Sequence, residues 1–122
     1  MSKCIMVVDD SATVRESLRM TLSAAGYRIL PAIDGVDALA KLAGERVDML
    51  ISDLNMPNLD GLGLLTAVRQ NPAFRFTPFL MLTTELAEDK KRAGKVGGAA
   101  GWIVKPFRPD QMLKVVRILL GN

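Results

Sequence analysis

Histidine is absent from this chain of 122 residues, and cysteine occurs once, as Cys4. One thiol cannot form an internal disulfide, and without histidine the usual ligand combinations of a zinc site are missing. No apolar run approaches the roughly 20 residues that a membrane-spanning helix needs, and the N-terminus does not resemble a signal peptide. We therefore expect no disulfide scaffold, no zinc site and no membrane insertion, and we expect a cytoplasmic protein.

A concentration of charge of one sign is also missing. Sixteen Lys and Arg residues against thirteen Asp and Glu give a net charge of +3, and the only basic cluster is at 90–92. No interleaved aromatic residues or known DNA-binding motif accompany that cluster, so a solvated helix face explains it better than a nucleic-acid surface. Because 49% of the residues are hydrophobic, the chain can bury one compact core. We expect a single domain over residues 1–122 and no direct binding of nucleic acid.

Short apolar runs alternate with amphipathic segments along the chain. Four continuous apolar runs, at 4–8, 49–52, 79–82 and 102–104, are typical of strands covered on both faces, and a weaker fifth strand fits 28–31. Between these runs, apolar residues recur at spacings of three and four, which predicts helices. The predicted inward faces are Val14, Leu18, Leu22 and Ala25; Val36, Leu39, Ala40 and Ala43; Leu64, Leu65 and Val68; and Met112, Val115, Val116 and Leu119. The alternation predicts an α/β fold with a parallel, doubly wound sheet.

Local signals mark the ends of the predicted helices. Ser11 and Asp34 are suited to cap two helix starts, Pro109 opens the last helix, and Gly26 and Gly121 follow helix ends. The helix expected at 85–96 is the least amphipathic, because its middle is charged and glycines lie near its end. Weak burial of that helix predicts weak local stability.

Acidic residues follow two of the predicted strands. Asp9 and Asp10 come after the first strand and Asp53 comes after the strand at 49–52. The carboxyl ends of parallel strands meet at one edge of such a sheet, where ligands bind. Three carboxylates there repel one another, and Mg²⁺ relieves the repulsion because it prefers oxygen ligands. We therefore expect a Mg²⁺ site, although Asp9 and Asp10 taken alone are better explained as helix-capping residues.

The same edge holds the parts needed for phosphoryl transfer. A carboxylate can attack phosphorus and form an acyl phosphate where cations neutralise the transferred group. Lys105 follows the last predicted strand, and an ammonium at the end of a buried strand needs an anionic partner. Thr83, at the end of another strand, offers a hydroxyl to a phosphoryl oxygen.

Four segments carry a specific resemblance. They are residues 7–11 (VVDDS), 50–57 (LISDLNMP) with the Asp-Gly pair at 60–61, 81–83 (MLT) and 104–107 (VKPF). In this order and spacing, the chain resembles the receiver domain of two-component response regulators over essentially its full length. The resemblance implies a flavodoxin-like fold with strand order 2-1-3-4-5 and five helices. It also implies a phosphoacceptor switch rather than an enzyme that turns over a substrate.

The resemblance implies a role for each acidic residue. Asp53 would accept the phosphoryl group. Asp10 and Asp53 would bind Mg²⁺ together with the backbone carbonyl of Asn55, and Asp9 would act mainly through the water shell of the metal.

The resemblance also implies how the switch works. Lys105 and Thr83 would bind the phosphoryl oxygens, and the peptide bond before Pro106 would be cis. On phosphorylation Thr83 would move toward the phosphoryl group while Trp102 swings inward. Most members with an aromatic residue at this position carry Tyr or Phe, so the larger indole is a departure.

Two further matches resemble chemotaxis regulators of this family. Asn55 lies two residues after the acceptor, and Glu85 lies two residues after Thr83. By resemblance this pair tunes dephosphorylation and implies a short-lived signal, which suits motility. The implied partners are a histidine kinase that donates the phosphoryl group and a downstream target, with the flagellar motor as one candidate and a phosphatase as a further candidate.

Other functions stay open at this point. We expect a stand-alone motility regulator, and the alternatives are the receiver of a larger regulator and a phosphorelay intermediate. A phosphatase of the haloacid dehalogenase type also uses an Asp nucleophile and Mg²⁺, but it needs a second Asp where Asn55 stands. A flavin carrier shares the fold, but Asp9 and Asp10 would repel the flavin phosphate.

Overall fold

The computed structural model describes residues 2–84 and 88–121. Within these residues, five strands alternate with five α-helices and one short 3₁₀ helix. In chain order they are β1 (Cys4–Val8), α1 (Ala12–Ala24), β2 (Arg28–Ala32), α2 (Gly35–Leu42), β3 (Met49–Ser52), α3 (Gly61–Gln70), η1 (Pro72–Phe74), β4 (Phe79–Thr83), α4 (Glu88–Val96), β5 (Gly101–Val104) and α5 (Pro109–Leu120). The five predicted strands are confirmed with shifts of at most one residue at their ends. The helix predicted at 85–96 is described from Glu88 onward, and residues 85–87 lie outside the described residues.

The five strands form one parallel sheet. Their order is β2-β1-β3-β4-β5, as the resemblance implied. From β1 the chain passes first to β2 at one edge and then back across to β3, so the strand order reverses between β1 and β3. In doubly wound sheets, ligands bind at the carboxyl ends of the strands beside this reversal.

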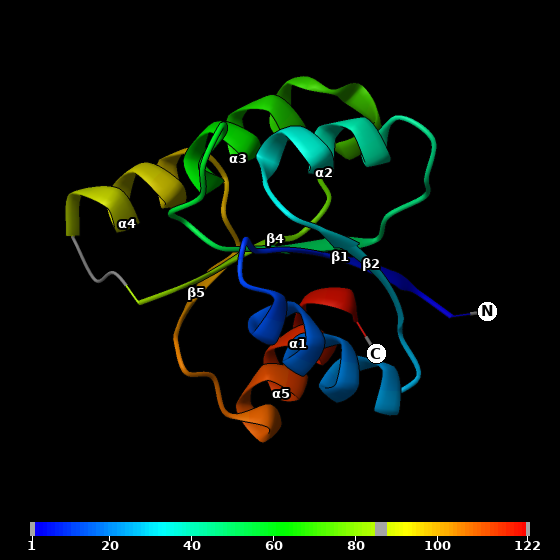
Figure 1. Cartoon of the computed structure of the whole chain (residues 1–122). Helices are drawn as coiled ribbons and strands as arrows, with labels where there is room; N and C mark the ends of the chain where they lie inside the picture. Colours follow the sequence, from blue (N-terminus) through cyan, green and yellow to red (C-terminus); the bar gives the residue numbers. More distant parts are fainter. Residues whose placement is uncertain (1, 85–87, 122) are drawn as a thin grey trace.

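Helices cover both faces of the sheet. Figure 1 shows α2, α3 and α4 on one face and α1 and α5 on the other. Each face buries its own apolar cluster, because strands covered on both sides point alternate side chains into each layer. No helix among the described residues is long and apolar enough to cross a membrane.

The predicted helix ends are present. The Ser11 side chain accepts a hydrogen bond from the backbone N–H of Val14, and Asp34 caps α2 in the same way by accepting from Asp37. These caps satisfy backbone donors that the first turn of a helix leaves unpaired. Gly121 follows α5 in the left-handed conformation that favours glycine.

The predicted inward face of α2 is wrong at Val36, Ala40 and Ala43, whereas Leu39 is partly buried against the core. Val36 is 54% exposed, and the residues that α2 buries are Gly35, Ala38 and Leu42. Gly35 faces inward and packs so closely that a Cβ there would lie 2.6 Å from the backbone oxygen of Leu59. Positions three and seven residues later then follow it inward. Alanine and glycine carry too little apolar signal for the sequence to show this phase.

Candidate functional site

Three carboxylates meet at the reversal of strand order. One carboxylate oxygen from each of Asp9, Asp10 and Asp53 lies within 4.8 Å of the other two. The pairing of Val8 with Ser52 sets the ends of β1 and β3 side by side, and the backbone N–H of Asp53 donates to the carbonyl of Val8 at 2.8 Å. Asp9 and Asp53 are buried, and Asp10 is exposed. The sheet therefore brings together the three acidic residues that the sequence predicted.

Hydrogen bonds fix the two buried carboxylates. One oxygen of Asp9 accepts from the backbone N–H of Ser11 at 2.9 Å, and Oδ1 of Asp53 accepts from the backbone N–H of Leu54 at 2.8 Å. The guanidinium of Arg15 donates to the backbone carbonyl of Asp9 at 2.6 Å. Sequence reasoning missed Arg15, because an arginine in the first turns of an amphipathic helix has the same signature as a solvated face.

Lys105 reaches the carboxylates from the end of β5. Its Nζ lies 2.7 Å from Oδ2 of Asp9 and 3.2 Å from Oδ2 of Asp53. The peptide bond between Lys105 and Pro106 is cis, and the backbone N–H of Lys105 donates to the carbonyl of Thr83 at 2.9 Å. The anionic partners that the sequence required for this ammonium are therefore Asp9 and Asp53.

The electrostatics of the site favour a cation. Burial raises the pKa of Asp53, the negative charge of Asp9 raises it further, and Lys105 opposes both effects. Burial lowers the pKa of Lys105, but its hydrogen bonds and charge interactions with Asp9 and Asp53 outweigh burial and leave the pKa above its ordinary value. Counted by formal charge, one lysine does not compensate three carboxylates. Two negative charges are left for another cation to neutralise.

The donor set fits Mg²⁺. All three side chains offer carboxylate oxygens, which are hard ligands, and the cluster has no histidine or thiolate. Mg²⁺ is bound in proteins by one or two carboxylates together with water and phosphate oxygens. The resemblance assigns the metal to Asp10 and Asp53 with the backbone carbonyl of Asn55, and to Asp9 through water, and the structure brings the three carboxylates of this set together.

Thr83 lies at the same edge of the sheet. It is the last residue of β4 and is fully buried. Ser52 of β3 pairs with Met81 of β4. Asp53 and Thr83 come one and two residues after this pair, so both lie at the carboxyl ends of neighbouring strands. Asn55 is exposed in the loop after β3. Glu85, the other residue predicted to tune dephosphorylation, lies outside the described residues.

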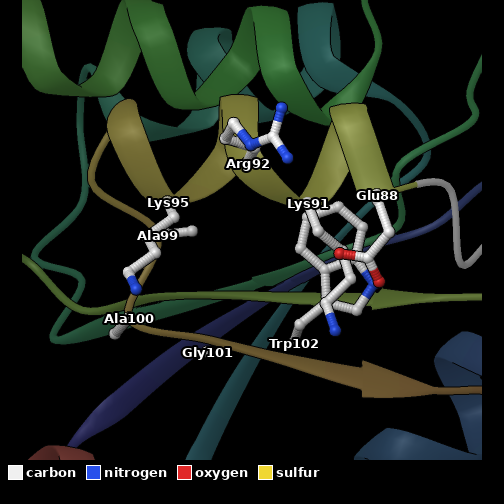
Figure 2. A pocket seen from close by; sticks show the side chains of 8 residues that line it. All are labelled: Glu88, Lys91, Arg92, Lys95, Ala99, Ala100, Gly101 and Trp102. Atoms are coloured by element: carbon white, nitrogen blue, oxygen red, sulfur yellow. The ribbon is translucent and has the colours of Figure 1, made fainter.

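Trp102 lies on the α4 side of the sheet and is partly buried against the core. A Cβ on Gly94 of α4 would lie 2.9 Å from the indole ring, so a side chain at residue 94 would force the ring or the helix to shift. The indole N–H is buried, and it has no hydrogen-bond partner among the described residues. Figure 2 shows the pocket between α4 and β5 that Trp102 lines. The charged residues of α4 that line it are Glu88, Lys91, Arg92 and Lys95.

Known proteins share this sequence and fold. The chemotaxis protein CheY1 of Helicobacter pylori is 39% identical over 120 residues, which cover 97% of each chain. The response regulator MprA of Mycobacterium ulcerans is 42% identical over 120 residues, which cover 98% of this chain and 51% of MprA. The crystal structure of the chemotaxis protein CheY4 of Vibrio cholerae superposes with a TM-score of 0.94 at 45% identity, covering 98% of this chain and 100% of CheY4.

The family model for the response regulator receiver domain matches residues 5–117. This range contains the whole carboxylate cluster together with Thr83 and Lys105. The motifs, the strand order and the relatives agree on one family. The chain belongs to the response regulator receiver domains.

Proposed function

We propose that Asp53 accepts a phosphoryl group and that the resulting acyl phosphate changes the affinity of this domain for a downstream protein. One observation carries the proposal: one carboxylate oxygen from each of Asp9, Asp10 and Asp53 lies within 4.8 Å of the other two, with the Lys105 ammonium 3.2 Å from Asp53. Carboxylates this close together repel one another, and the repulsion is relieved when cations bind there. Such clusters are therefore common at functional sites. A phosphoryl group with its metal is the ligand that fits the donors and the family.

The proposed reaction needs no general base, because an ionised carboxylate is already a nucleophile. A carboxylate oxygen of Asp53 forms a bond to phosphorus as the bond between phosphorus and the donor nitrogen of a phosphohistidine breaks. Lys105 turns from its carboxylate partners to a phosphoryl oxygen, and the Thr83 hydroxyl donates to another. Asp10, Asp53 and the carbonyl of Asn55 would hold Mg²⁺, which would supply positive charge to the transferred group.

Receiver domains as a family work between a histidine kinase and a downstream effector. For this chain we propose a role in chemotaxis or motility, because CheY1 and CheY4 are chemotaxis proteins and Asn55 matches regulators of that kind. A flagellar motor protein is then the candidate target, and a phosphatase is a candidate partner. We propose that residues 1–122 form one receiver domain that acts in the cytoplasm. The match to half of MprA supports the alternative that such a domain belongs to a larger regulator.

Intact-mass measurement after incubation with acetyl phosphate tests the acceptor. We expect the wild type to gain one phosphoryl group only with Mg²⁺ present. The Asp53→Asn variant should gain none, and Asp110→Asn, which changes an exposed carboxylate at the start of α5, should behave as the wild type. Phosphorylation of Asp53→Asn at the wild-type rate would contradict the proposal.

Trp102 fluorescence tests the switch in the same samples. Mg²⁺ and then beryllofluoride should each change the emission of the wild type, and the second change should vanish in Asp53→Asn. For the cellular role, swimming in soft agar should fail in a gene deletion and recover with the wild type but not with Asp53→Asn. Normal swimming of the deletion strain would remove the motility assignment while leaving the phosphorylation chemistry untouched.

A further inference from the structure

One residue in the loop between β3 and α3 has an unusual backbone. Asn58 has φ +72°, and it is the only residue other than glycine with positive φ among the described parts of the chain. L-residues enter this left-handed region rarely, and asparagine tolerates it better than most. Although Asn58 is exposed, its side-chain amide donates a hydrogen bond to Oδ2 of Asp34 at 2.8 Å. The loop conformation is therefore accompanied by a specific contact with another element.

Asp34 is well suited to hold this loop. It is only 7% exposed and stands at the N-cap of α2, where its Oδ1 accepts from the backbone N–H of Asp37 at 2.8 Å. Hydrogen bonds from that N–H and from the Asn58 amide lower the pKa of Asp34, so the carboxylate stays ionised and is a strong acceptor. One oxygen orders α2 and the other orders the loop.

Packing supports the hydrogen bond on both sides. Next to Asn58, the backbone oxygen of Leu59 would lie 2.6 Å from a Cβ on Gly35, so the loop rests directly on the first turn of α2. At its other end the loop is closed by a hydrogen bond from the backbone N–H of Gly61 to the carbonyl of Leu54, at 2.8 Å. The loop is thus held by a hydrogen bond between its two ends and by contacts with α2.

We propose that Asn58 and Asp34 are positioning residues for the metal site, because their hydrogen bond holds the loop that carries Asn55. This inference rests on the proposed function, in which the backbone carbonyl of Asn55 is a metal ligand. A backbone ligand has no rotamer to adjust, so its place depends entirely on how the loop is held. Outer contacts that orient metal ligands commonly contribute to metal affinity.

Two variants remove the hydrogen bond in different ways. Asn58→Gly deletes the side chain and keeps the left-handed backbone, because glycine adopts positive φ without strain. Asp34→Ser keeps a residue that caps α2 but is too short to reach Asn58. Asn71→Gly is the matched control, because it makes the same substitution at a second loop asparagine. The Asn71 side chain accepts a hydrogen bond from the backbone N–H of Ala73 at 3.0 Å, away from the metal site.

The experiment is a calorimetric titration of Mg²⁺ into each purified protein, with thermal unfolding of the metal-free proteins measured alongside. We expect Asn58→Gly and Asp34→Ser each to weaken Mg²⁺ binding roughly tenfold. The double variant should bind Mg²⁺ no more weakly than the single variant with the lower affinity, because both changes remove the same hydrogen bond. Asn71→Gly should bind as the wild type.

Wild-type affinity in Asn58→Gly and Asp34→Ser would overturn the inference, even if their melting temperatures fall, because the contact would then be structural only. Additive losses in the double variant would also overturn it, since two independent effects would be at work. Failure of the wild type itself to bind Mg²⁺ is a different result. It would remove the proposed metal site, and with it the proposed function.

Discussion

Helices α1 and α4 lie on opposite faces of the sheet, and they are anchored in contrasting ways (Figure 1). The first is 13 residues long and buries Leu18 and Leu22 almost completely in the cluster beneath β1. In α4, nine residues long, Gly94 is the only buried residue among those whose burial is described, and Val96 is 83% exposed. Large apolar side chains hold α1 in place, whereas α4 approaches the sheet through a glycine.

The α1 side and the α4 side of the site therefore differ in how firmly they are held. On the α1 side, Ser11 and Arg15 hydrogen-bond to Asp9 and fix it. On the α4 side, the buried indole N–H of Trp102 has no partner within the described residues, and the helix above it buries little surface. A switch needs an element whose two arrangements differ by little free energy. We therefore expect the α4 side to move when the site is occupied and the α1 side to stay.

The largest expected effect is on the anchored side. Leu22→Ala should lower the free energy of unfolding by about 2–5 kcal/mol, because it removes a fully buried side chain and leaves a cavity. Urea denaturation followed by circular dichroism measures this. Equal losses for Leu22→Ala and for a truncation in α4 would break the comparison.

The carboxylate cluster gives a smaller effect of opposite sign. Asp53→Asn should raise the unfolding temperature of the metal-free protein by a few degrees, because burial and Asp9 make the ionised form of Asp53 unfavourable. The pKa of Asp53 is raised in the folded state, so its favourable contribution is full below the unfolded value of about 3.9 and is lost as the pH rises through the folded value. The gap between variant and wild type should therefore widen from acid toward neutral pH.

Thermal melts at several pH values, with a chelator present, test this. Saturating Mg²⁺ should make the wild type melt at a higher temperature than Asp53→Asn, the reverse of the metal-free result. The reason is that the metal binds only the folded state and so stabilises it. A variant that is less stable than the metal-free wild type at neutral pH would contradict the raised pKa.

Gly94→Ala should have a still smaller effect on stability and a clear effect on Trp102. The new Cβ would lie 2.9 Å from the indole, which forces the ring or the helix to shift. Alanine favours the helix by up to about 1 kcal/mol over glycine, so the two effects nearly cancel in the free energy of unfolding. A shifted emission maximum with little change in stability is the expected result. An unchanged emission spectrum would mean that α4 does not hold the ring.

Val96→Ser should have the smallest effect. Its side chain is 83% exposed, and exposed substitutions away from special features change stability by about 0.5 kcal/mol or less. Urea denaturation should give a curve close to that of the wild type. A loss as large as that of Leu22→Ala would mean that α4 is anchored after all.

The sequence by itself determined the order of strands and helices along the chain, the caps at Ser11 and Asp34, and the acidic cluster with Lys105. These features depend on local signals: apolar runs long enough for one strand, cap residues that bond within one turn, and motifs at strand ends. The strand order came from the family resemblance and not from the periodicity, because every strand of a parallel sheet reads as a similar apolar run.

Only the tertiary structure decided which face of α2 turns inward, where Trp102 lies, and which contacts support the site. The bond between Asn58 and Asp34 joins residues 24 positions apart, and Lys105 meets Asp9 across 96 positions. The sequence predicted that Lys105 and Asp9 share one edge of the sheet, but it did not predict the contact between Asn58 and Asp34, because no local pattern joins a loop asparagine to a helix cap. Distant contacts depend on how whole elements pack, and that packing is the property of the folded chain.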